Sequence, residues 1–425
     1  MTSVSRCFSK SIDLQYWASS KPYGFSPGNR REARVVPTTE NYRLNCSTPA
    51  VLRDGCDILM PVRFSRNSHL WRFIKGDIGL PSSFDALYYS GILRLVRPLT
   101  GGMGVILMAH RVGERSDFLA PMFTPPAFLE RCIQYVRNAG WTIVSLEEMY
   151  RRVQGEVDSR EPFVCFTFDD GYRDNITLAL PIFERHNAPF TIYVPSGAPD
   201  RTINPWWSAL DRIVSEHEEI VLERAQQESV LSCRTKQEKQ KVYWMLWELC
   251  FPDLSVAEHA EVIQRLYSRY GITAEDELDR ICLSWSELRR IAKHPLVTIG
   301  GHTSSHPVLP KLSDESARQE IRGGTERLEQ ELNSKVDHFA YPYGLACERD
   351  MQLVADLGFK TAVVTHKGNI FPETRNHLVT LPRRSFENLP LNNRVIRNSI
   401  FGTDNLLDML RGRPLIIKAE SVPAA

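Results

Sequence analysis

Short apolar runs alternate with stretches of helical periodicity through the middle of the chain. Seven runs predict buried strands, at residues 105–109, 142–145, 163–168, 190–194, 296–300, 337–341 and 361–364. Between several of these runs, apolar residues recur at i, i+3 and i+4, as in 126–139 and 146–153, which predicts amphipathic helices. Buried strands that alternate with helices are typical of parallel sheets, so the pattern indicates an α/β fold.

One long segment interrupts this alternation between the fourth and fifth predicted strands. It spans roughly residues 199–282, and the stretches 236–249 and 257–270 within it have the periodicity of amphipathic helices. A loop at this point leaves the carboxyl end of a parallel sheet. We therefore expect a helical insertion that covers that end of the sheet.

The two ends of the chain differ from its middle. Residues 1–75 show little periodicity and are rich in Ser, Pro, Asn and Arg, so we expect a poorly ordered N-terminal extension. The main domain is expected to occupy residues 76–400, and residues 401–425 are expected to form a C-terminal tail.

Two adjacent carboxylates follow the third predicted strand. Asp169 and Asp170 come directly after the run 163–168, and Gly171 then begins a turn. Chemistry in α/β folds is concentrated where parallel strands end. A solvated turn would explain an isolated Asp-Asp pair equally well, so the pair needs support from elsewhere in the chain.

That support comes from two histidines that follow the fifth predicted strand. His302 and His306 are spaced i and i+4, which would place both imidazoles on one side of a single helical turn that Pro307 then ends. An isolated pair of this kind is more often a surface feature. Here two neutral imidazoles and the Asp170 carboxylate would leave open positions on a divalent metal, as a hydrolytic site requires.

Three ordered motifs now resemble the NodB-homology polysaccharide deacetylases, which form carbohydrate esterase family 4. They are residues 167–171, 302–306 and 339–344, and the resemblance covers roughly residues 104–386. It implies a deformed (β/α)7 barrel. It also implies metal-dependent hydrolysis of N-acetyl groups on amino sugars, in GlcNAc-containing polysaccharide, oligosaccharide or lipid-linked precursor, with release of acetate.

The resemblance also implies roles for individual residues. The implied metal ligands are Asp170, His302 and His306, with Asp169 as the general base and the backbone N–H of Tyr343 as an oxyanion donor beside Pro342 at the substrate. A carboxylate close to a cation stays ionised and can accept a proton, which agrees with the role of the base. Zinc is the first choice of cofactor, with cobalt, nickel or iron as alternatives for the same ligands.

A general acid is needed as well, because an amine leaves poorly unless it is protonated. His110 ends the apolar run 105–109, which resembles the start of the circularly permuted branch of the family, where the last barrel strand has moved to the front. We therefore expect His110 to be the acid. His366, which also ends an apolar run, is the competing candidate.

The third motif departs from the family at Ala340, where an arginine usually orients the base. Arg383 or Arg384 could supply a positive charge instead, although for either one alone a solvated side chain is the expectation. Trp206 and Trp207 open the insertion, and they could bind substrate by stacking on a sugar ring or equally form the core of the insertion.

Composition excludes several other classes of protein. The 425 residues include 52 basic and 51 acidic residues, so the net charge of +1 gives no reason to expect binding to nucleic acid. No apolar run reaches the length of a transmembrane helix, and the first residues lack the apolar core of a secretion signal. Nine cysteines without a C-x-x-C pair predict neither a disulfide framework nor a zinc knuckle. A cytoplasmic enzyme with a saccharide substrate is the expectation, and nothing indicates its oligomeric state.

Two other functions remain open at this point. A related metal-dependent amidohydrolase that acts on another amide would need the same site chemistry. A catalytically silent saccharide-binding protein is less consistent with Asp169, because a binding protein needs no base beside its metal and an unpaired buried carboxylate is unfavourable.

Overall fold

The computed structural model describes residues 92–114, 122–224, 227–250, 256–387, 396–397, 400 and 402–410. The expected N-terminal extension, residues 1–75, lies outside this part of the chain. So do residues 411–425 of the expected C-terminal tail, whereas residues 403–410 form a helix.

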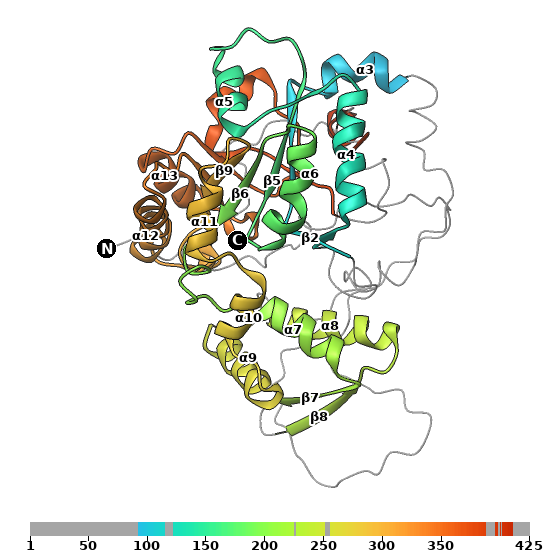
Figure 1. Cartoon of the computed structure of the whole chain (residues 1–425), viewed down its shortest axis with the longest axis vertical. Coiled ribbons are helices and arrows are strands. Elements are labelled where there is room, and N and C mark those ends of the chain that lie inside the picture. Colours follow the sequence, from blue (N-terminus) through green and yellow to red (C-terminus); the bar gives the residue numbers. More distant parts are fainter. Residues whose placement is uncertain are drawn as a thin grey trace, which may run out of the picture. The chain divides into compact units, whose positions relative to one another are not determined.

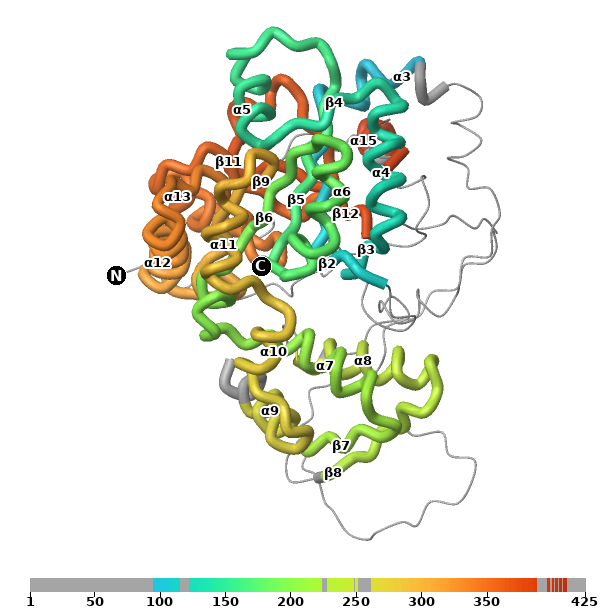
Figure 2. The backbone as a smooth tube through the Cα atoms, in the orientation of Figure 1, coloured from blue at the N-terminus to red at the C-terminus, as the bar shows by residue number. Residues whose placement is uncertain are grey.

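A parallel sheet of eight strands forms the centre of the barrel domain (Figures 1 and 2). Its order in space is β11 (Thr361–Val363), β10 (His338–Ala340), β9 (Val297–Gly301), β6 (Phe190–Val194), β5 (Phe163–Phe168), β1 (Gly104–Ala109) and β12 (Arg384–Ser385), with β4 (Thr142–Ile143) paired to β5. All pairings in this sheet are parallel. The seven strands predicted from the sequence are all present, which confirms the expected α/β fold, and the two-residue strand β12 is additional.

One segment near the end of the barrel domain joins the two edges of the sheet. Leu381 forms a parallel bridge with Val363 of β11, and four residues later Ser385 pairs with β1. The backbone N–H of Phe386 continues this pairing by donating to Met108. The sheet therefore curls into a barrel, in agreement with the deformed (β/α)7 architecture that the sequence predicts.

The strand β5 shows how the barrel positions side chains. All six of its residues are buried, as expected for a parallel strand covered on both faces. Val164 and Phe166 pack in the large core cluster with the outer helices, whereas Phe163 and Cys165 belong to a second cluster on the opposite face. Because successive residues alternate between faces, Asp169 continues the second row and points into the barrel.

Helices surround the sheet (Figure 1). They are α4 (Pro126–Asn138), α5 (Leu146–Gln154), α6 (Leu180–Arg185), α11 (Trp285–Ile291), α12 (Asp314–Leu332) and α13 (Glu348–Asp356). Two further helices, α3 (Ile92–Thr100) and α15 (Thr403–Leu410), come from opposite ends of the part of the chain that the structure describes. The Asn405 amide of α15 donates to the Thr100 carbonyl at 2.7 Å, so these two helices are tied together.

The segment between β6 and β9 forms a subdomain with its own core, at the bottom of Figure 2. Its elements are α7 (Trp206–Glu216), β7 (Glu219–Arg224), β8 (Gln227–Ser232), α8 (Lys236–Cys250), α9 (Val256–Tyr270) and α10 (Ala274–Ile281). The two helices predicted within the insertion correspond to α8 and α9. The antiparallel hairpin β7–β8 was not predicted, since many of its residues are polar and its apolar alternation is short.

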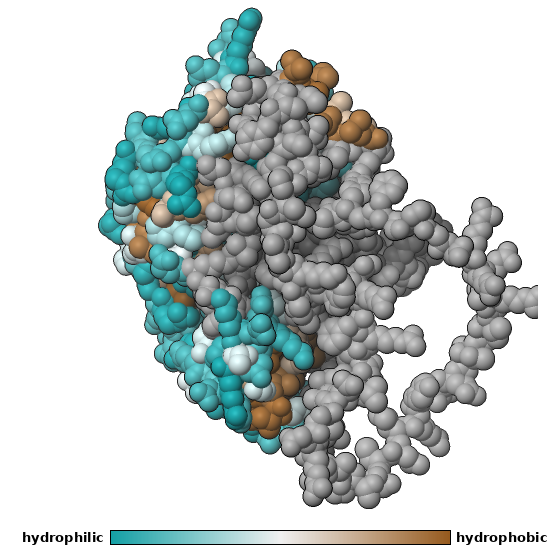
Figure 3. Space-filling view, turned by 90° about the vertical axis from the view of Figure 1, so that its right-hand side faces the viewer, coloured by the Kyte–Doolittle hydropathy of each residue, from teal (hydrophilic) through white to brown (hydrophobic). Residues whose placement is uncertain are grey.

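The described surface is mainly hydrophilic on the face that Figure 3 shows, with a few hydrophobic patches. Among the described residues the most exposed large apolar side chains are Leu95 of α3 and Leu410 of α15, at 80% and 76%. Within the same residues, no helix has both the length and the apolar character needed to span a lipid bilayer.

Candidate active site

The loop that follows β5 turns both of its carboxylates toward the same site. Asp169 is directed inward by the strand, and Asp170 has a positive φ of 72°, which breaks the alternation of the strand. Gly171 follows with a φ of 65°. Positive φ is rare for a residue other than glycine, so the backbone holds Asp170 in a conformation that the surrounding structure must stabilise.

Asp170, His302 and His306 form a compact group at the carboxyl ends of β5 and β9. One carboxylate oxygen of Asp170 lies 3.4 Å from the Nε2 atom of each histidine, and the three ligand atoms all lie within 4.8 Å of one another. The Nδ1 atom of His302 donates to the Ala340 carbonyl at 2.7 Å, which leaves its Nε2 lone pair directed at Asp170. Three nitrogen and oxygen donors at this spacing fit one divalent cation and leave positions open for other ligands.

The histidines converge through a tight loop rather than through the helical turn expected from their spacing. Residues 302–308 are not helical, and Thr303 and His306 both have positive φ, at 66° and 59°. Glu320 of α12 fixes the loop because its carboxylate accepts the backbone N–H groups of Ser304 and Ser305, at 3.1 and 2.8 Å. The prediction of a helical turn was therefore wrong, although the two imidazoles do point toward the same site.

Asp169 is paired with an arginine from the last strand segment of the barrel. Arg383 makes two hydrogen bonds of 2.7 Å to the two carboxylate oxygens of Asp169, and both side chains are buried. Burial alone would raise the pKa of Asp169, but the Arg383 guanidinium outweighs this effect and lowers the pKa below its ordinary value. Asp169 is therefore ionised. Arg383 supplies the positive charge that the side chain of Ala340 cannot provide.

The expectation that Arg383 and Arg384 are each solvated was wrong for both. Arg384 is also buried, and its guanidinium donates to Asn369 and Asn405 at 3.0 Å in each case. Arg383 directly precedes β12, and successive residues of an extended segment point to opposite faces, so only Arg383 reaches the carboxylate of Asp169.

His110 ends β1 and is held by a second carboxylate, that of Glu387. One oxygen of Glu387 accepts the backbone N–H of His110 at 2.5 Å, and the other lies 2.9 Å from its Nδ1 atom. Burial lowers the pKa of His110, but the charge of Glu387 and that of Asp170 outweigh burial and raise the pKa to about 9. The Asn175 amide also donates to the His110 carbonyl at 2.8 Å. His110 is thus a fixed, protonated imidazole.

Glu387 was not among the residues found from the sequence. It follows the two-residue strand β12, and such a short strand gives no apolar pattern to detect. Once the register is known, the placement is simple, because Ser385 pairs with Met108 and two further residues bring Glu387 beside His110. The backbone carbonyl of the competing histidine, His366, accepts the Arg383 N–H at 3.0 Å. Burial lowers the pKa of its imidazole, on which the charges of Asp408 and Arg384 also act.

Tyr343 lies next to the histidine loop. It belongs to the 3-10 turn Pro342–Gly344 and has a positive φ of 59°, and its ring centroid is 4.6 Å from that of His306. The neighbouring Pro342 is buried. The structure therefore brings the third motif against the second, as the sequence resemblance implies.

Trp206 and Trp207 begin α7 and are buried, with only 4% and 8% of their surface exposed. Both pack in the core of the insertion. The Trp207 ring also lies 5.4 Å from that of His306. Stacking on a sugar requires an exposed ring face, so this burial favours the alternative in which the pair forms core.

Comparison with known proteins agrees with this site. The sequence model of the polysaccharide deacetylase family matches residues 156–243 and 257–362, which include β5, β9 and β10 with the three motifs. No curated protein matches the chain in sequence.

Several solved structures are similar over most of the chain. The deacetylase PplD from Streptococcus pyogenes, solved with acetate, is 19% identical over 68% of this chain and 96% of its own, with a TM-score of 0.46. IcaB from Ammonifex degensii is 17% identical over 71% and 98%, with a TM-score of 0.46. A polysaccharide deacetylase from Bacillus cereus is 15% identical over 70% and 68%, with a TM-score of 0.45. These similarities are too remote to assign a substrate.

The family match falls on the strands that carry the two carboxylates and the two histidines of the site. The part of the chain that carries the site, residues 156–243 and 257–362, therefore matches the polysaccharide deacetylase family.

Proposed function

We propose that this protein hydrolyses N-acetyl groups on amino sugars in a metal-dependent reaction that releases acetate. The observation that carries the proposal is that buried charged groups of three different kinds lie close together in one site. A three-residue cation site, an ionised carboxylate held by Arg383 and a protonated imidazole held by Glu387 interact with one another in one place. Hydrolysis of an unactivated amide needs all three kinds of group.

Asp169 acts as the general base. Arg383 keeps its carboxylate ionised and fixes its orientation through two parallel hydrogen bonds. Asp169 takes a proton from a water molecule while the oxygen of that water attacks the acetyl carbonyl carbon. The carboxylate is directly followed in sequence by Asp170, so the base and the cation site share one loop.

His110 acts as the general acid. As the C–N bond of the tetrahedral intermediate breaks, the His110 imidazolium gives its proton to the leaving nitrogen, and the products are acetate and a free amine. The Glu387 carboxylate at 2.9 Å from Nδ1 directs the proton to be transferred onto Nε2. The backbone N–H of Tyr343 is our candidate for an oxyanion donor, and Pro342 beside it for a substrate contact.

Asp170, His302 and His306 would hold the divalent cation, whose chemistry is to polarise the acetyl carbonyl as a Lewis acid. Two imidazoles and one carboxylate suit zinc, and cobalt, nickel or iron fit the same donor set. The substrate class is GlcNAc-containing polysaccharide, oligosaccharide or lipid-linked precursor. This choice is supported by the family match.

The test is acetate release from N-acetylglucosamine oligomers by metal-reconstituted protein, with Asp169→Asn in parallel. Release that requires the metal and disappears in the variant would support both the reaction and the base. If neither protein releases acetate although both bind one equivalent of metal, the deacetylase proposal fails for these substrates. A panel of other amides would then test for a related amidohydrolase, and binding without turnover would indicate a silent saccharide-binding protein.

A further inference from the structure

The two histidines of the cation site are held in different ways. A metal-binding histidine normally donates its second ring N–H to a carbonyl or carboxylate, which fixes the orientation of the ring. His302 follows this rule through the Ala340 carbonyl. The Nδ1 atom of His306 is buried and has no hydrogen-bond partner among the residues that the structure describes. Something other than a hydrogen bond must therefore set the orientation of the His306 ring.

Aromatic rings surround the His306 imidazole instead. The ring centroids of Trp207 and Tyr343 lie 5.4 and 4.6 Å from that of His306, with interplanar angles of 50° and 65°. The ring of His302 lies 4.8 Å away. Close packing against neighbours that cannot themselves move restricts the orientation of a ring.

Hydrogen bonds of Trp206 and Trp207, in the first turn of α7, hold both aromatic neighbours of His306 in place. The indole N–H of Trp207 donates to the Tyr172 hydroxyl at 2.7 Å, and Tyr172 lies two residues after Asp170. The adjacent Trp206 forms a side-chain hydrogen bond with the Tyr343 hydroxyl. The two tryptophan rings are nearly perpendicular, at 84°, so consecutive residues reach partners on two different loops of the barrel.

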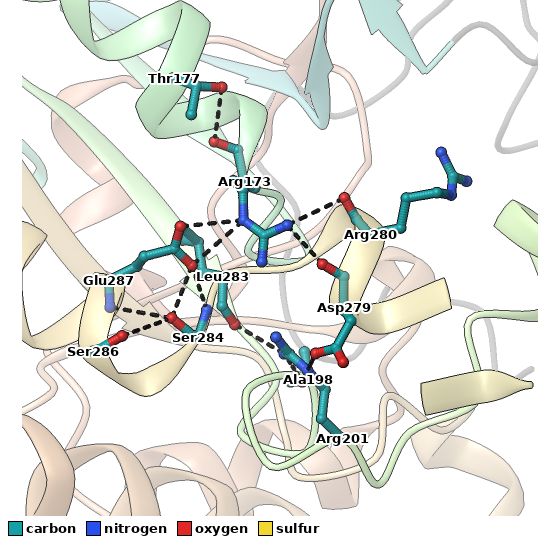
Figure 4. Close-up of polar contacts among 10 residues, drawn as sticks. All are labelled: Arg173, Thr177, Ala198, Arg201, Asp279, Arg280, Leu283, Ser284, Ser286 and Glu287. Carbon is teal, nitrogen blue, oxygen red and sulfur yellow. Dashed lines mark hydrogen bonds and ion pairs between the residues drawn. The ribbon is translucent and has the colours of Figure 1, made fainter. Parts of the chain in front are cut away.

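The insertion that carries α7 is fastened to the barrel at both of its ends (Figure 4). Near its start, Arg201 donates to the Ala198 carbonyl at 2.7 Å and to the Leu283 carbonyl at 3.1 Å, which joins the start to the end. Near its end, the Arg173 guanidinium binds the Asp279 carbonyl at 2.6 Å and Glu287 at 3.1 Å.

The loop after Asp170 is held by the same junction. The Leu283 N–H donates to Gly171 at 3.0 Å, and the Arg173 N–H donates to Ile281 at 2.7 Å. Tyr172 forms an antiparallel bridge with Cys282. The insertion therefore contacts all three loops of the site, through its last residues at Gly171 and through α7 at His306 and Tyr343.

We propose that Trp206 and Trp207 are positioning residues that hold the His306 imidazole and the Tyr343 loop in place for the cation. This inference rests on the proposed function in that it takes the same three residues as the cation site. It assigns the insertion to the scaffold of that site, rather than to a lid that opens over it.

The test measures metal binding rather than turnover. Full-length protein with Trp207→Ala is titrated with cobalt(II) in competition with a chelator, and the visible absorption bands of the bound cobalt are recorded. Trp244→Ala is the matched control, because Trp244 packs in the same insertion core against Tyr243 and Trp247. We expect Trp207→Ala to weaken cobalt affinity by about 10- to 100-fold and to change the absorption bands, as for other residues that support a ligand, while Trp244→Ala leaves both unchanged.

Two milder variants cover the case in which Trp207→Ala fails to fold. Trp207→Phe keeps a ring against His306 but loses the N–H, and Tyr172→Phe removes the same hydrogen bond from its other end. Each should weaken cobalt binding by several-fold, and the double variant should bind no more weakly than either single one.

Equal affinities in all variants, or equal losses in the Trp207 variants and the Trp244 control, would overturn the proposal. Failure of the wild-type protein to bind cobalt would overturn both this proposal and the proposed function. Cobalt binding that depends on Trp207 in a protein without deacetylase activity would retain the positioning role and reject only the proposed reaction.

Discussion

Replacing Glu387 with glutamine should remove the charge that keeps His110 protonated while it leaves the shape of the side chain almost unchanged. In the wild-type protein the pKa of His110 is about 9, against an ordinary value of 6.5. The difference of about 2.5 in pKa corresponds to about 3 kcal/mol in favour of the imidazolium. Because burial acts in the opposite direction, loss of the Glu387 charge should bring the pKa to 6.5 or lower.

The effect on the rate depends steeply on pH. With pKa values of about 9 and 6.5, the protonated fractions of His110 differ by about fourfold at pH 7 and by about 75-fold at pH 8.5. The alkaline limb of kcat/KM for N-acetylglucosamine oligomers should therefore move to lower pH by about 2.5 units in Glu387→Gln. Hydrolysis of 4-nitrophenyl acetate should change far less, because nitrophenolate leaves without a proton.

The control is Glu373→Gln, which changes an exposed carboxylate of the same domain. An NMR titration of the His110 imidazole would give the same pKa without turnover. If Glu387→Gln keeps an alkaline limb near pH 9, or loses ester and amide hydrolysis equally, then Glu387 does not act through the protonation of His110.

The same linkage predicts how stability depends on pH. The folded state raises the pKa of His110, so the ion pair with Glu387 contributes fully below pH 6.5 and its contribution is lost as the pH rises through about 9. Urea unfolding of wild type and Glu387→Gln should therefore differ most near pH 6 and least above pH 9. A difference that is constant over this range would contradict the ion-pair explanation.

Three further perturbations have definite outcomes. Arg383→Ala should lower the free energy of unfolding by about 3–5 kcal/mol, because it leaves a buried carboxylate unpaired, and the double variant with Asp169→Asn should be less destabilised. Arg383→Ala should also reduce turnover while metal content stays unchanged. Equal losses of turnover and metal would contradict this role. Gly324→Ala should lower the melting temperature and weaken metal binding, since its Cβ would lie 2.4 Å from the Thr303 backbone. The control Gly323→Ala, whose Cβ would have nothing nearer than 3.6 Å, should be neutral or slightly stabilising. Similar melting curves for the two variants would refute the argument. Asp170→Asn should lose most of its zinc affinity in a chelator competition. Wild-type protein treated with chelator should lose acetate release and regain it when zinc is added. Acetate release without metal would reject the cation site.

Long apolar runs made the barrel predictable from the sequence. The residues 163–168 and 190–194 are apolar except for Thr167 and Thr191, because their strands are buried on both faces, and such runs leave little choice of structure. The site residues that end these runs were predictable for the same reason. Asp169, Asp170 and His302 each stand one or two residues beyond a strand, where a parallel sheet gathers its chemistry.

The interactions that complete the site were not predictable, since they depend on long-range register. Arg383 and Glu387 are ordinary charged residues in a segment with a two-residue strand, and only its pairing with β1 and β11 places them on Asp169 and His110. The loop with His306 was predicted as a helical turn because spacing alone does not reveal a positive φ. The partners of Trp207 likewise became known only when an insertion and a barrel loop were seen in contact.

The barrel-closing segment has a consequence for how the protein is made. His110 and Glu387 are 277 residues apart in the chain, and Asp169 and Arg383 are 214 apart. The ribosome therefore synthesises the three cation ligands well before it reaches Arg383 and Glu387, the partners of Asp169 and His110. Contacts of such sequence separation form late and slowly in folding. Until residues 381–387 emerge and close the barrel, the nascent polypeptide holds a carboxylate without its arginine and an imidazole without its charge partner. Asp169 and His110 therefore gain their partners only after the cation ligands have been translated.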